Sequence, residues 1–571
     1  MRIVIVGGVA AGVSAATRAK RLLGEKAEVV LFERGDRISF ANCALPYYAG
    51  GVIRPEALYA AKAERLEALY GIDIREREEV LSINRAAKQI LAKNLATGEE
   101  YSLAYDKLVL ATGAEPRMLP IPGLKEFAHP LWRPEDALRL EKKLSEHPGL
   151  VVGIIGGGAV GVETAENVVR RGGIVHLMEN GTTVMGRNDQ GLSNAFLRSA
   201  SSEKRLVIHL SDSAAKVEAG AGGRLLVTLQ SGRTIEIDDL ISAAGVQPRS
   251  KLAADAGLEL GARGTILADR FMRTSDPDIY AVGDVATSWD PVKQDERPMM
   301  LAGTAVKEAR ACADALAGLS RAPMAGGFGT NGVSLFGMLW TTTGRHEQML
   351  VNEGLVPHRD FFRATVLSRS HASWYPGSAE LVLKLLFDAK GGILGAQALG
   401  RDGADKRIDV ISAAMRFGAT AADLAELDLC YCPQTGAPKD PVNIAGHLAL
   451  NVLDGLVRFI EPQELRDLMA GKAPYLGEGV DTTGPATILD VREDEELSSD
   501  SLEWPLLHIP SGEVRERLDE VPADRLTVVV CRAGVRAYAA ARALMTDGRR
   551  RAPIFVLAGG MRYYRMTEPL V

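Results

Sequence analysis

Residues 150–180 have the sequence LVVGIIGGGAVGVETAENVVRRGGIVHLMEN, which decides the fold class of this part of the chain. An apolar strand is followed by three glycines in G-x-G-x-x-G spacing, an amphipathic helix, and a second strand that ends at an acid. In folds with this β–α–β pattern, the helix N-terminus meets a pyrophosphate and the acid binds ribose hydroxyls. The residues concerned are Gly156, Gly158, Gly161 and Glu179.

The residues that follow Glu179 bear on the choice of nicotinamide cofactor. Asn180, Gly181 and Thr182 come next, and none is an arginine that could bind a 2′-phosphate. We therefore expect NADH to be preferred over NADPH.

The same pattern occurs a first time at the N-terminus. Residues 2–23, RIVIVGGVAAGVSAATRAKRLL, form a strand, a glycine-rich turn and a helix, and residues 28–35, EVVLFERG, form the next strand. Val9 stands where the middle glycine of the motif is usual. Two copies in one chain favour dinucleotide binding over plain tight turns. The residues expected to bind the first cofactor here are Gly7, Gly8, Gly12 and Glu33.

The composition of the whole chain fits a multidomain globular protein. Its 571 residues correspond to roughly three to four domains. A net charge of -6 argues against nucleic acid as a partner. No apolar run approaches the ~18 to 20 residues of a membrane helix, and the N-terminus does not resemble a secretory signal. Five scattered cysteines favour a reducing cytoplasm, and Cys430 and Cys432 lack the second pair that a zinc site needs.

Three further segments carry a family resemblance: YDKLVLATGAEPRMLPIPG at 105–123, SAAGVQP at 242–248, and TSDPDIYAVGDVA at 274–286. With the two glycine-rich turns, their order resembles the two-dinucleotide-binding flavoprotein disulfide reductases over about residues 1 to 450. The resemblance implies that the first fold binds FAD and the second binds NAD(P)H. It also implies that Asp284 holds the flavin ribityl chain, and that Thr112, Gly113 and Gly245 belong to the cofactor site.

One cysteine stands alone in SFANCALPYYAGG, residues 39–51. Large members of the family carry a C-x-x-x-x-C pair, but neither Tyr47 nor Tyr48 is a cysteine, so Cys43 has no local disulfide partner. A single thiol must cycle through a sulfenic acid or a mixed disulfide with a small thiol. The stretch resembles the coenzyme A disulfide reductase branch, which uses the mixed disulfide. The NADH oxidase and peroxidase branch, which uses the sulfenic acid, remains the alternative.

Binding of coenzyme A requires several cations, because the molecule carries a 3′-phosphate and a diphosphate. Arg18 and Arg21 lie three residues apart on the first helix and share a face. They could equally form a solvated helix face. The family resemblance implies that they approach CoA, together with Ser39, Asn42, Arg75 and Lys439.

Two later segments, HASWYPG at 371–377 and LCYCPQTGAPKDPVN at 429–443, resemble the dimerisation domain of the same branch. The resemblance implies a homodimer in which Tyr375 and Tyr431 approach the redox cysteine of the partner subunit, where they would hydrogen-bond or protonate the leaving thiolate. Trp374 and the CPQTG stretch depart from the family pattern. We interpret Cys432 as a packing residue.

The tail contains a third kind of motif. In VVVCRAGVRAYAAA, residues 528–541, a strand leads into a loop from Cys531 to Arg536 and then into a helix. Backbone N–H groups of such a loop converge on one anion, and Arg532 with Arg536 favours a thiolate. The tail resembles a rhodanese domain, with Asp490 and Arg492 matching its DVR element. The alternative, a dual-specificity phosphatase, would have a loop one residue longer.

The sequence therefore predicts an α/β protein with two Rossmann-like dinucleotide-binding domains, an α+β dimerisation domain and a C-terminal α/β rhodanese domain. The expected boundaries are 1–115 and 240–322 for FAD, 116–239 for NAD, 323–452 for dimerisation, 453–482 for a linker, and 483–571 for the rhodanese domain.

The expected function is NADH-dependent reduction of CoA persulfide, polysulfide or CoA disulfide through Cys43–S–S–CoA, with release of sulfide. Cys531 would handle sulfane sulfur. The rival functions are a CoA disulfide reductase that acts on the symmetrical disulfide, with rhodanese as a side activity, an NADH oxidase or peroxidase, and a flavin-bearing redox sensor that binds a partner protein.

Overall fold

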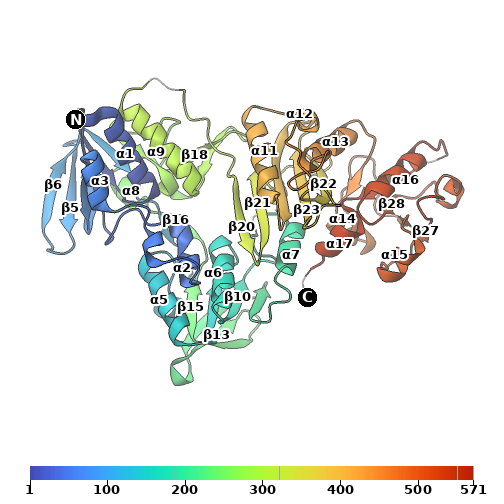
Figure 1. Cartoon of the computed structure of the whole chain (residues 1–571), viewed down its shortest axis with the longest axis horizontal. Coiled ribbons are helices and arrows are strands. Elements are labelled where there is room, and N and C mark those ends of the chain that lie inside the picture. The colour runs from blue at the N-terminus through green and yellow to red at the C-terminus, as the bar shows by residue number, and fades with distance from the viewer. Residues whose placement is uncertain (187, 320–321, 550, 570–571) are drawn as a thin grey trace. The chain divides into compact units, whose positions relative to one another are not determined.

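The computed structural model describes residues 1–186, 188–319, 322–549 and 551–569. It divides into two compact units, each described by itself below. The first unit comprises Met1–Val184 and Glu203–Gly329, and the second comprises Met185–Ser202 and Thr330–Val571. Figure 1 labels their elements. Within the described ranges, no helix is long and apolar enough to cross a lipid bilayer.

The first unit begins with a five-stranded parallel sheet in the order β17-β7-β1-β2-β3. Its strands are β1 (Arg2–Val6), β2 (Glu28–Glu33), β3 (Asp73–Glu76), β7 (Lys107–Leu110) and β17 (Ile279–Ala281). Helices α1 (Ala10–Leu23) and α9 (Ala302–Leu316) pack on each other. Their contact is made largely of buried alanines, whose small side chains let the two helices approach closely.

A second parallel sheet in this unit has the order β11-β10-β9-β15. Its strands are β9 (Val151–Ile155), β10 (Ile174–Glu179), β11 (Leu206–Leu210) and β15 (Asp239–Ser242). Helix α6 (Ala159–Arg170) connects β9 to β10, which completes the β–α–β unit expected from the sequence. The short antiparallel pair β8 (Ala114–Pro116) and β16 (Val246–Pro248) carries the chain between the two sheets.

Smaller elements complete the first unit. Two antiparallel sheets contain β4 (Glu78–Asn84), β5 (Gln89–Asn94) and β6 (Glu100–Ala104), and β12 (Ala214–Ala219), β13 (Leu225–Leu229) and β14 (Thr234–Ile237). A hairpin pairs β18 (Thr287–Asp290) with β19 (Asp295–Pro298). The remaining helices are α2 (Leu45–Ala49), α3 (Ala63–Tyr70), α4 (Leu124–Phe127), α5 (Pro134–Glu146) and α8 (Lys251–Asp255).

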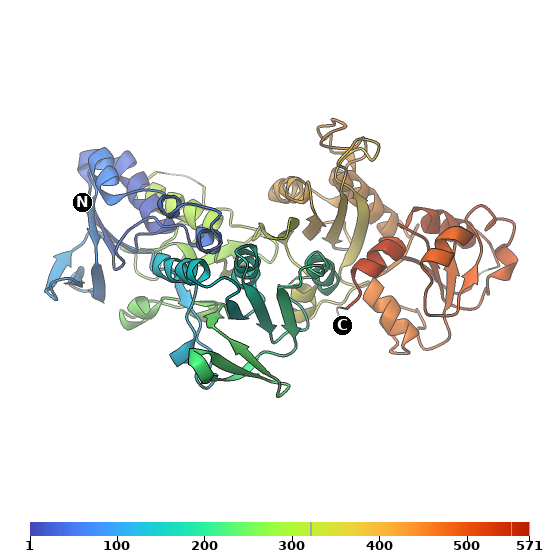
Figure 2. The same ribbon diagram turned by 60° about the horizontal axis from the view of Figure 1, so that its bottom comes forward.

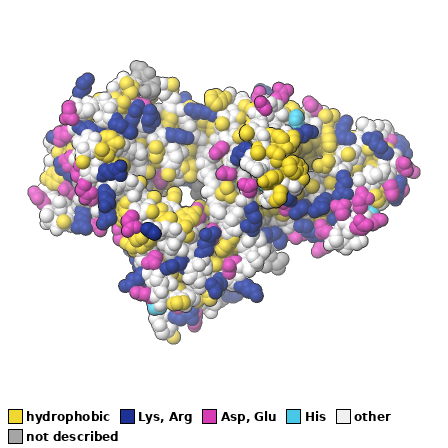
Figure 3. Space-filling view, in the orientation of Figure 1, with side chains coloured by type: hydrophobic (Ala, Val, Ile, Leu, Met, Phe, Trp, Pro, Cys, Tyr) yellow, Lys and Arg dark blue, Asp and Glu magenta, His cyan; other side chains and the backbone are white. Residues whose placement is uncertain are grey.

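The second unit contains an antiparallel sheet in the order β20-β21-β24-β23-β22. Its strands are β20 (Asn331–Leu335), β21 (Met338–Gly344), β22 (Phe362–Arg369), β23 (Glu380–Phe387) and β24 (Ile393–Gly400). The helices of this part are α7 (Gln190–Arg198), α10 (Glu347–Asn352), α11 (Ala404–Arg416), α12 (Ala421–Glu426) and α13 (Pro441–Leu453). Apolar side chains gather over the region of α11 to α13, as Figure 3 shows. Phe417, which ends α11, is 89% exposed.

The tail forms a parallel sheet in the order β25-β29-β28-β26-β27. The strands are β25 (Phe459–Ile460), β26 (Thr487–Asp490), β27 (Leu507–His508), β28 (Thr527–Val530) and β29 (Ile554–Leu557). Helices on both faces bury this sheet (Figure 2): α16 (Val535–Met545) belongs to one core cluster, and α14 (Pro462–Met469) and α17 (Gly560–Met566) belong to the other. The short helix α15 (Asp494–Ser499) has no buried residue. The stretch 453–482, expected as a linker, supplies the edge strand β25 and α14. A two-residue strand is too short to leave a periodic signal in the sequence.

Candidate functional site

The first glycine-rich turn is so tight that only glycine fits at two of its positions. Gly7 has φ +114°, and a Cβ there would lie 2.1 Å from the carbonyl oxygen of Ala111. A Cβ at Gly12 would lie 1.8 Å from the carbonyl oxygen of Gly7. Glu33, at the end of β2, accepts a hydrogen bond of 2.8 Å from the Gly8 N–H through Oε2. The acid and the turn therefore form one site.

The second turn repeats this construction. Gly156 has φ +108°, and a Cβ at Gly161 would lie 1.9 Å from the Gly156 carbonyl oxygen. Glu179 Oε2 accepts from the Gly157 N–H at 2.6 Å, while a Cβ at Gly158 would meet nothing within 4 Å. Each turn therefore has a backbone N–H hydrogen-bonded to an acid, and the second turn also leaves open space at Gly158, as a dinucleotide site needs.

The segments that share the family pattern meet beside the first turn. Thr112 Oγ1 donates to the Arg249 carbonyl at 2.8 Å, and the Arg249 N–H donates to the Gly113 carbonyl at 2.9 Å. Gly245, with φ +93°, accepts from the Arg117 N–H at 2.9 Å. These contacts hold the two ends of β8 and β16 in place.

Asp284 directly follows the last strand of the first sheet, in a 3-10 turn at Gly283–Val285. Burial raises the pKa of its carboxyl to about 6. Among the described residues, no donor hydrogen-bonds this carboxylate, although burial of a charge normally requires one. A row of ligand hydroxyls would supply the missing donors, so Asp284 and the first turn fit FAD with its ribityl chain.

The stretch that carries Cys43 connects the two glycine-rich turns. The Ser39 N–H donates to the Gly8 carbonyl at 2.7 Å, on the side of the first turn. The Tyr47 hydroxyl donates to Glu163 Oε1 at 3.2 Å, and Glu163 lies on α6, the helix that begins at the second turn. Helix α2 packs on α5 and α6. Cys43 therefore lies between the two predicted cofactor sites.

The surroundings of Cys43 favour the neutral thiol. Burial raises the pKa of the Cys43 thiol, and the negative charges of Glu163 and Asp284 raise it further. Burial also raises the pKa of Glu163. Burial, with the charge of Glu163, raises the pKa of Tyr47 to about 12. No other cysteine belongs to this cluster, which agrees with the absence of a C-x-x-x-x-C pair.

The side chains expected to bind CoA already interact with other protein groups, and these interactions differ in kind. Arg18 Nη2 lies 2.7 Å from Asp314 Oδ1, across the contact between α1 and α9. The Arg21 guanidinium lies over the Tyr70 ring at 5.9 Å. Arg75 pairs with Asp73 at 2.7 Å, and the Tyr101 hydroxyl accepts a hydrogen bond from its Nη1 at 2.7 Å. The amide of Asn42 donates to the Trp132 carbonyl at 3.4 Å.

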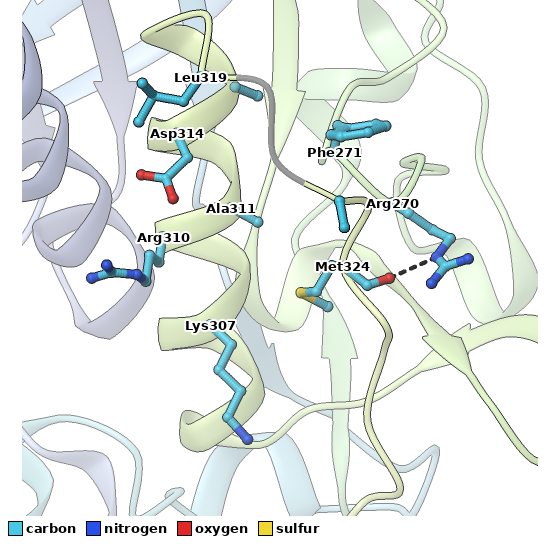
Figure 4. Close-up of a pocket in the computed structure, with 10 residues that line it drawn as sticks. Arg270, Phe271, Lys307, Arg310, Ala311, Asp314, Leu319 and Met324 are labelled. Carbon is cyan, nitrogen blue, oxygen red and sulfur yellow. Dashed lines mark hydrogen bonds between the residues drawn. The ribbon is translucent and has the colours of Figure 1, made fainter. Parts of the chain in front are cut away.

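A cavity of about 180 Å³ lies on the face of α9 beside the Arg18–Asp314 pair. Figure 4 shows Lys307, Arg310 and Asp314 projecting from α9, with Arg270 and Met324 on the other side. Arg270 Nε donates to the Met324 carbonyl at 2.6 Å. Lys307 and Arg310 have no ion-pair partner among the described residues, so they add unpaired positive charge next to Arg18.

The residues expected to act on the partner subunit lie together in the second unit. Gln434 Nε2 donates to the Tyr375 hydroxyl at 2.9 Å, which ties the loop 429–443 to the loop 371–377. Tyr431 is 47% exposed and Trp374 is 72% exposed. Lys439 is also exposed. These side chains are therefore available to a ligand or to another subunit.

The tail loop surrounds the sulfur of Cys531. Sγ accepts the N–H groups of Gly534 at 3.1 Å and Ala537 at 3.3 Å, and the residue is 1% exposed. Helix α16 begins at Val535, so its first turn forms the end of the loop. Arg536 is held by Glu496 at 2.6 Å, which keeps the pKa of Glu496 down at about 2, while Arg532 is exposed.

The DVR element lies beneath this loop. Asp490 Oδ2 and Arg492 Nη2 are 2.7 Å apart, and both side chains are almost fully buried. The pair ends β26, the strand next to the one that leads into Cys531. The pair therefore lies beside β28, the strand that leads into the loop from Cys531 to Arg536.

Sequence reasoning missed Glu163 and the pair Lys307 and Arg310. Glu163 lies two residues after Gly161, but nothing in the sequence indicates its contact with Tyr47, 116 positions away. Lys307 and Arg310 are three residues apart on α9, and that spacing was a usable signal for a shared face.

Two family profiles match the chain. The profile of the pyridine nucleotide-disulphide oxidoreductases matches residues 1–309, and that of the dimerisation domain of the same family matches residues 335–439. A coenzyme A disulfide reductase of Staphylococcus aureus (strain JH9) is 30% identical over 458 residues, covering 78% of this chain and 99% of the relative.

Solved structures resemble the chain over nearly its whole length. The reduced Bacillus anthracis CoADR-RHD has a TM-score of 0.91 and 37% identity, covering 99% of this chain and 98% of its own. The NAD-dependent persulfide reductase from A. fulgidus has a TM-score of 0.87 and 31% identity, with 99% and 100% covered. A water-forming NADH oxidase from Lactobacillus brevis, at 23% identity and a TM-score of 0.73, covers 80% of this chain and 99% of its own, and shares the fold alone.

Proposed function

Because the chain belongs to the pyridine nucleotide-disulphide oxidoreductase family and is an FAD-dependent oxidoreductase, we propose that it reduces persulfides and disulfides of coenzyme A with NADH. Polysulfide is included in the same substrate class. The observation that carries the proposal is the position of Cys43 between the two glycine-rich turns, without a second cysteine. Such a thiol takes its disulfide partner from the substrate.

We assign FAD to the residues around the first glycine-rich turn and NADH to those around the second. FAD would be held by Gly7, Gly8, Gly12, Glu33, Thr112, Gly113, Gly245 and Asp284, and NADH by Gly156, Gly158, Gly161 and Glu179. Bound FAD supplies a carrier that passes two electrons from NADH to a disulfide. The carboxylate of Glu179, with no arginine beside it, supports a preference for NADH.

The substrate would be bound along α1 and its neighbours. Arg18, Arg21 and Lys439 would contact the phosphates of CoA, and Ser39, Asn42 and Arg75 would line the same route. Arg75 is already engaged by Asp73 and Tyr101, so its contribution to phosphate binding requires that it leave or share these partners. Lys307 and Arg310 would not have to give up an ion-pair partner among the described residues to bind a phosphate.

The proposed chemistry begins with the Cys43 thiolate. It attacks the CoA-side sulfur of CoA persulfide, which breaks the S–S bond, releases hydrosulfide and leaves Cys43–S–S–CoA. Two electrons from NADH then reopen this mixed disulfide, and the CoA thiol leaves. Overall, one CoA persulfide, one NADH and one proton give one CoA thiol, one hydrogen sulfide and one NAD⁺.

The residues around Cys43 would control the protons. Because the charge of Glu163 raises the pKa of the Cys43 thiol, the thiolate is favoured when this carboxyl is protonated or turned away. Tyr375 and Tyr431 of a partner subunit would donate a proton to the departing thiolate. A homodimer follows from this role, and the dimerisation-domain match supports it.

The tail would act as a rhodanese domain over 483–571, with Cys531 carrying a persulfide. The two N–H groups at Sγ, with Arg532 and Arg536, support an anionic sulfur there. The remaining domains are proposed at 1–115 with 240–322, 116–239 and 323–452. Cys531 would deliver or accept the outer sulfur of the shuttle thiol.

The test compares acceptors with purified holoenzyme. We expect NADH oxidation with CoA persulfide to release sulfide, and a Cys43→Ser variant to release none. Turnover on CoA disulfide is measured beside it, since a higher rate there would make the symmetrical disulfide the main substrate. Rapid consumption of oxygen or peroxide without sulfide would overturn the proposal in favour of the oxidase or peroxidase. Binding of a protein without NADH turnover would favour a redox sensor.

A further inference from the structure

Helix α9 carries a buried acid that the proposed function does not use. Glu308 is 1% exposed, and no cation of the described chain forms an ion pair with it. Both of its carboxyl oxygens are hydrogen-bonded. The Gly283 N–H donates to Oε2 at 2.8 Å, and the Ser288 hydroxyl hydrogen-bonds to Oε1. Glu308 therefore joins α9 to the turn Gly283–Val285 and to β18.

The N–H that Glu308 binds belongs to the residue directly before Asp284, the proposed acceptor for the flavin ribityl chain. Gly283 has φ +77°, and a Cβ there would lie 2.9 Å from the Cβ of Ala11 on α1. Helix α1 thus packs closely on the turn, while α9 holds the turn's N–H through Glu308. The direction in which Asp284 leaves the turn is therefore set by contacts with both helices.

Two buried carboxyls so close together cannot both carry a charge without a large cost. Burial raises the pKa of Glu308 to about 8, and the charge of Asp284 adds to this effect. Burial raises the pKa of Asp284 only to about 6. At neutral pH the two acids therefore differ in state: Asp284 is the anion and Glu308 is the neutral acid.

A neutral acid matches the two groups that Glu308 contacts. Its carbonyl oxygen accepts the Gly283 N–H, and its O–H donates to the Ser288 oxygen, because a hydroxyl can also accept. An ionised carboxylate would add a second negative charge beside Asp284. FAD bound at this turn would exclude water from it, which strengthens the repulsion between two carboxylates.

We propose that Glu308, in its neutral form, is a positioning residue of the FAD site. It fixes the turn that carries Asp284 and leaves Asp284 as the ionised member of the pair. The inference rests on the proposed placement of FAD at the first glycine-rich turn and Asp284. Its consequence is that FAD binds to the protein in which Glu308 is protonated.

Few titratable groups face Glu308. The turn presents Asp284, β18 presents the Ser288 hydroxyl, and α1 packs on α9 largely through buried alanines. Within the described residues, Asp284 is the only charged group that affects the pKa of Glu308. Cys43 is linked to the same turn, because the charge of Asp284 raises the pKa of its thiol. The test must therefore separate Glu308 from Cys43.

The experiment titrates FAD-free, full-length protein with FAD at pH values on both sides of 8 and follows flavin fluorescence. The wild type should lose affinity about tenfold per pH unit above about pH 8, because Glu308 must first take up a proton. Glu308→Gln keeps both hydrogen bonds and cannot ionise. It should bind FAD like the wild type at neutral pH and keep this affinity above pH 8. Glu308→Ala, which loses both hydrogen bonds, should bind FAD roughly tenfold more weakly at neutral pH.

Glu296→Gln is the matched control. Glu296 is half-buried on β19, the strand that pairs with β18, and burial raises its pKa as well. It is not among the groups that affect the pKa of Glu308 or of Asp284. This variant should lose FAD affinity above pH 8 as the wild type does.

The inference is overturned if the wild type shows no loss above pH 8, or if Glu308→Gln shows the same loss, which would assign it to Cys43 or another group. Weaker binding by Glu308→Gln at neutral pH, or unchanged binding by Glu308→Ala, also overturns it. If Glu308→Ala does not fold, the comparison of Glu308→Gln with the wild type decides. In all these cases the wild type binds FAD, so the proposed function stands. A wild type that binds no FAD would refute the proposed placement of the cofactor itself.

Discussion

The hydroxyl of Tyr47 donates a hydrogen bond to Glu163 Oε1 at 3.2 Å, joining the cysteine stretch to the helix of the second glycine-rich turn. This contact places a carboxylate beside Cys43, where its charge adds to burial in raising the pKa of the thiol. Cys43, the proposed redox cysteine, is thus connected to the predicted NADH turn through a titratable side chain.

Replacing Glu163 with glutamine should make the Cys43 thiol more acidic, because one negative charge that raises its pKa is removed. The measurement is the rate of Cys43 alkylation by iodoacetamide against pH, followed on the Cys43 peptide. We expect the rise in rate to occur at lower pH than in the wild type.

Glu166→Gln is the matched control. Glu166 lies on the same helix and pairs with Arg170 at 2.6 Å, but it is not among the groups that raise the pKa of Cys43. Its alkylation profile should follow the wild type. Coincident profiles for Glu163→Gln and wild type would refute the electrostatic role of Glu163.

FAD binding should weaken as pH falls through about 6, the pKa to which burial raises Asp284. Ribityl hydroxyls donate to an ionised carboxylate, so binding favours deprotonation. Below its raised pKa, Asp284 must lose a proton first, which costs roughly tenfold in affinity per pH unit. The check is a flavin fluorescence titration of FAD-free protein at pH values on both sides of 6.

Asp284→Asn should bind FAD more weakly but without this pH dependence. Glu308, which accepts from the Gly283 N–H, has a pKa raised to about 8 by burial, so it stays protonated through this range and does not account for the effect. If FAD binding by Asp284→Asn still weakens as the pH falls, another titrating group is responsible for the pH dependence.

The sequence predicts those parts of the fold and site that depend on local spacing. The glycine turns, with their strands and helices, are short-range patterns, and so is the loop from Cys531 to Arg536. Each can be recognised because the required residues lie within one β–α–β unit.

Contacts between distant segments could not be predicted in this way. Arg18 looked free on its helix, yet it meets Asp314, 296 positions along the chain. The Tyr47–Glu163 contact likewise depends on the packing of α2 on α6. Pairing over such separations is decided by tertiary packing, which periodicity does not encode.

Lys384→Met should strongly destabilise the second unit. Lys384 Nζ lies 2.5 Å from Asp189, 2.6 Å from Glu347 and 3.3 Å from Glu461, and its side chain is 2% exposed. Removing the cation leaves buried carboxylates uncompensated, at a cost of about 3 to 5 kcal/mol. Lys251→Met, at an 86% exposed side chain, should cost less than about 1 kcal/mol. Urea unfolding compares them, and equal effects would contradict the role of the buried charge.

Lys307→Gln with Arg310→Gln should raise the KM for CoA persulfide about tenfold, the loss of ~1.4 kcal/mol in phosphate binding. The KM for glutathione persulfide, which has no phosphate, should not change. Lys142→Gln, at an exposed lysine on α5, is the control. An equal rise with both persulfides would mean that the cations of α9 do not recognise CoA phosphates.

Glu179→Gln should narrow the preference for NADH over NADPH. The carboxylate is fixed by the Gly157 and Gly181 N–H groups, at 2.6 and 2.7 Å, in the position where it would accept both ribose hydroxyls. Glutamine keeps one acceptor and removes the charge that repels a 2′-phosphate. We expect kcat/KM for NADH to fall about tenfold, equivalent to ~1.4 kcal/mol, and that for NADPH to fall less.

The control is Glu218→Gln, at a surface residue of β12, which should leave the ratio of kcat/KM for NADH to that for NADPH unchanged. If the ratio also stays the same in Glu179→Gln, the choice of nicotinamide cofactor is made elsewhere in the site.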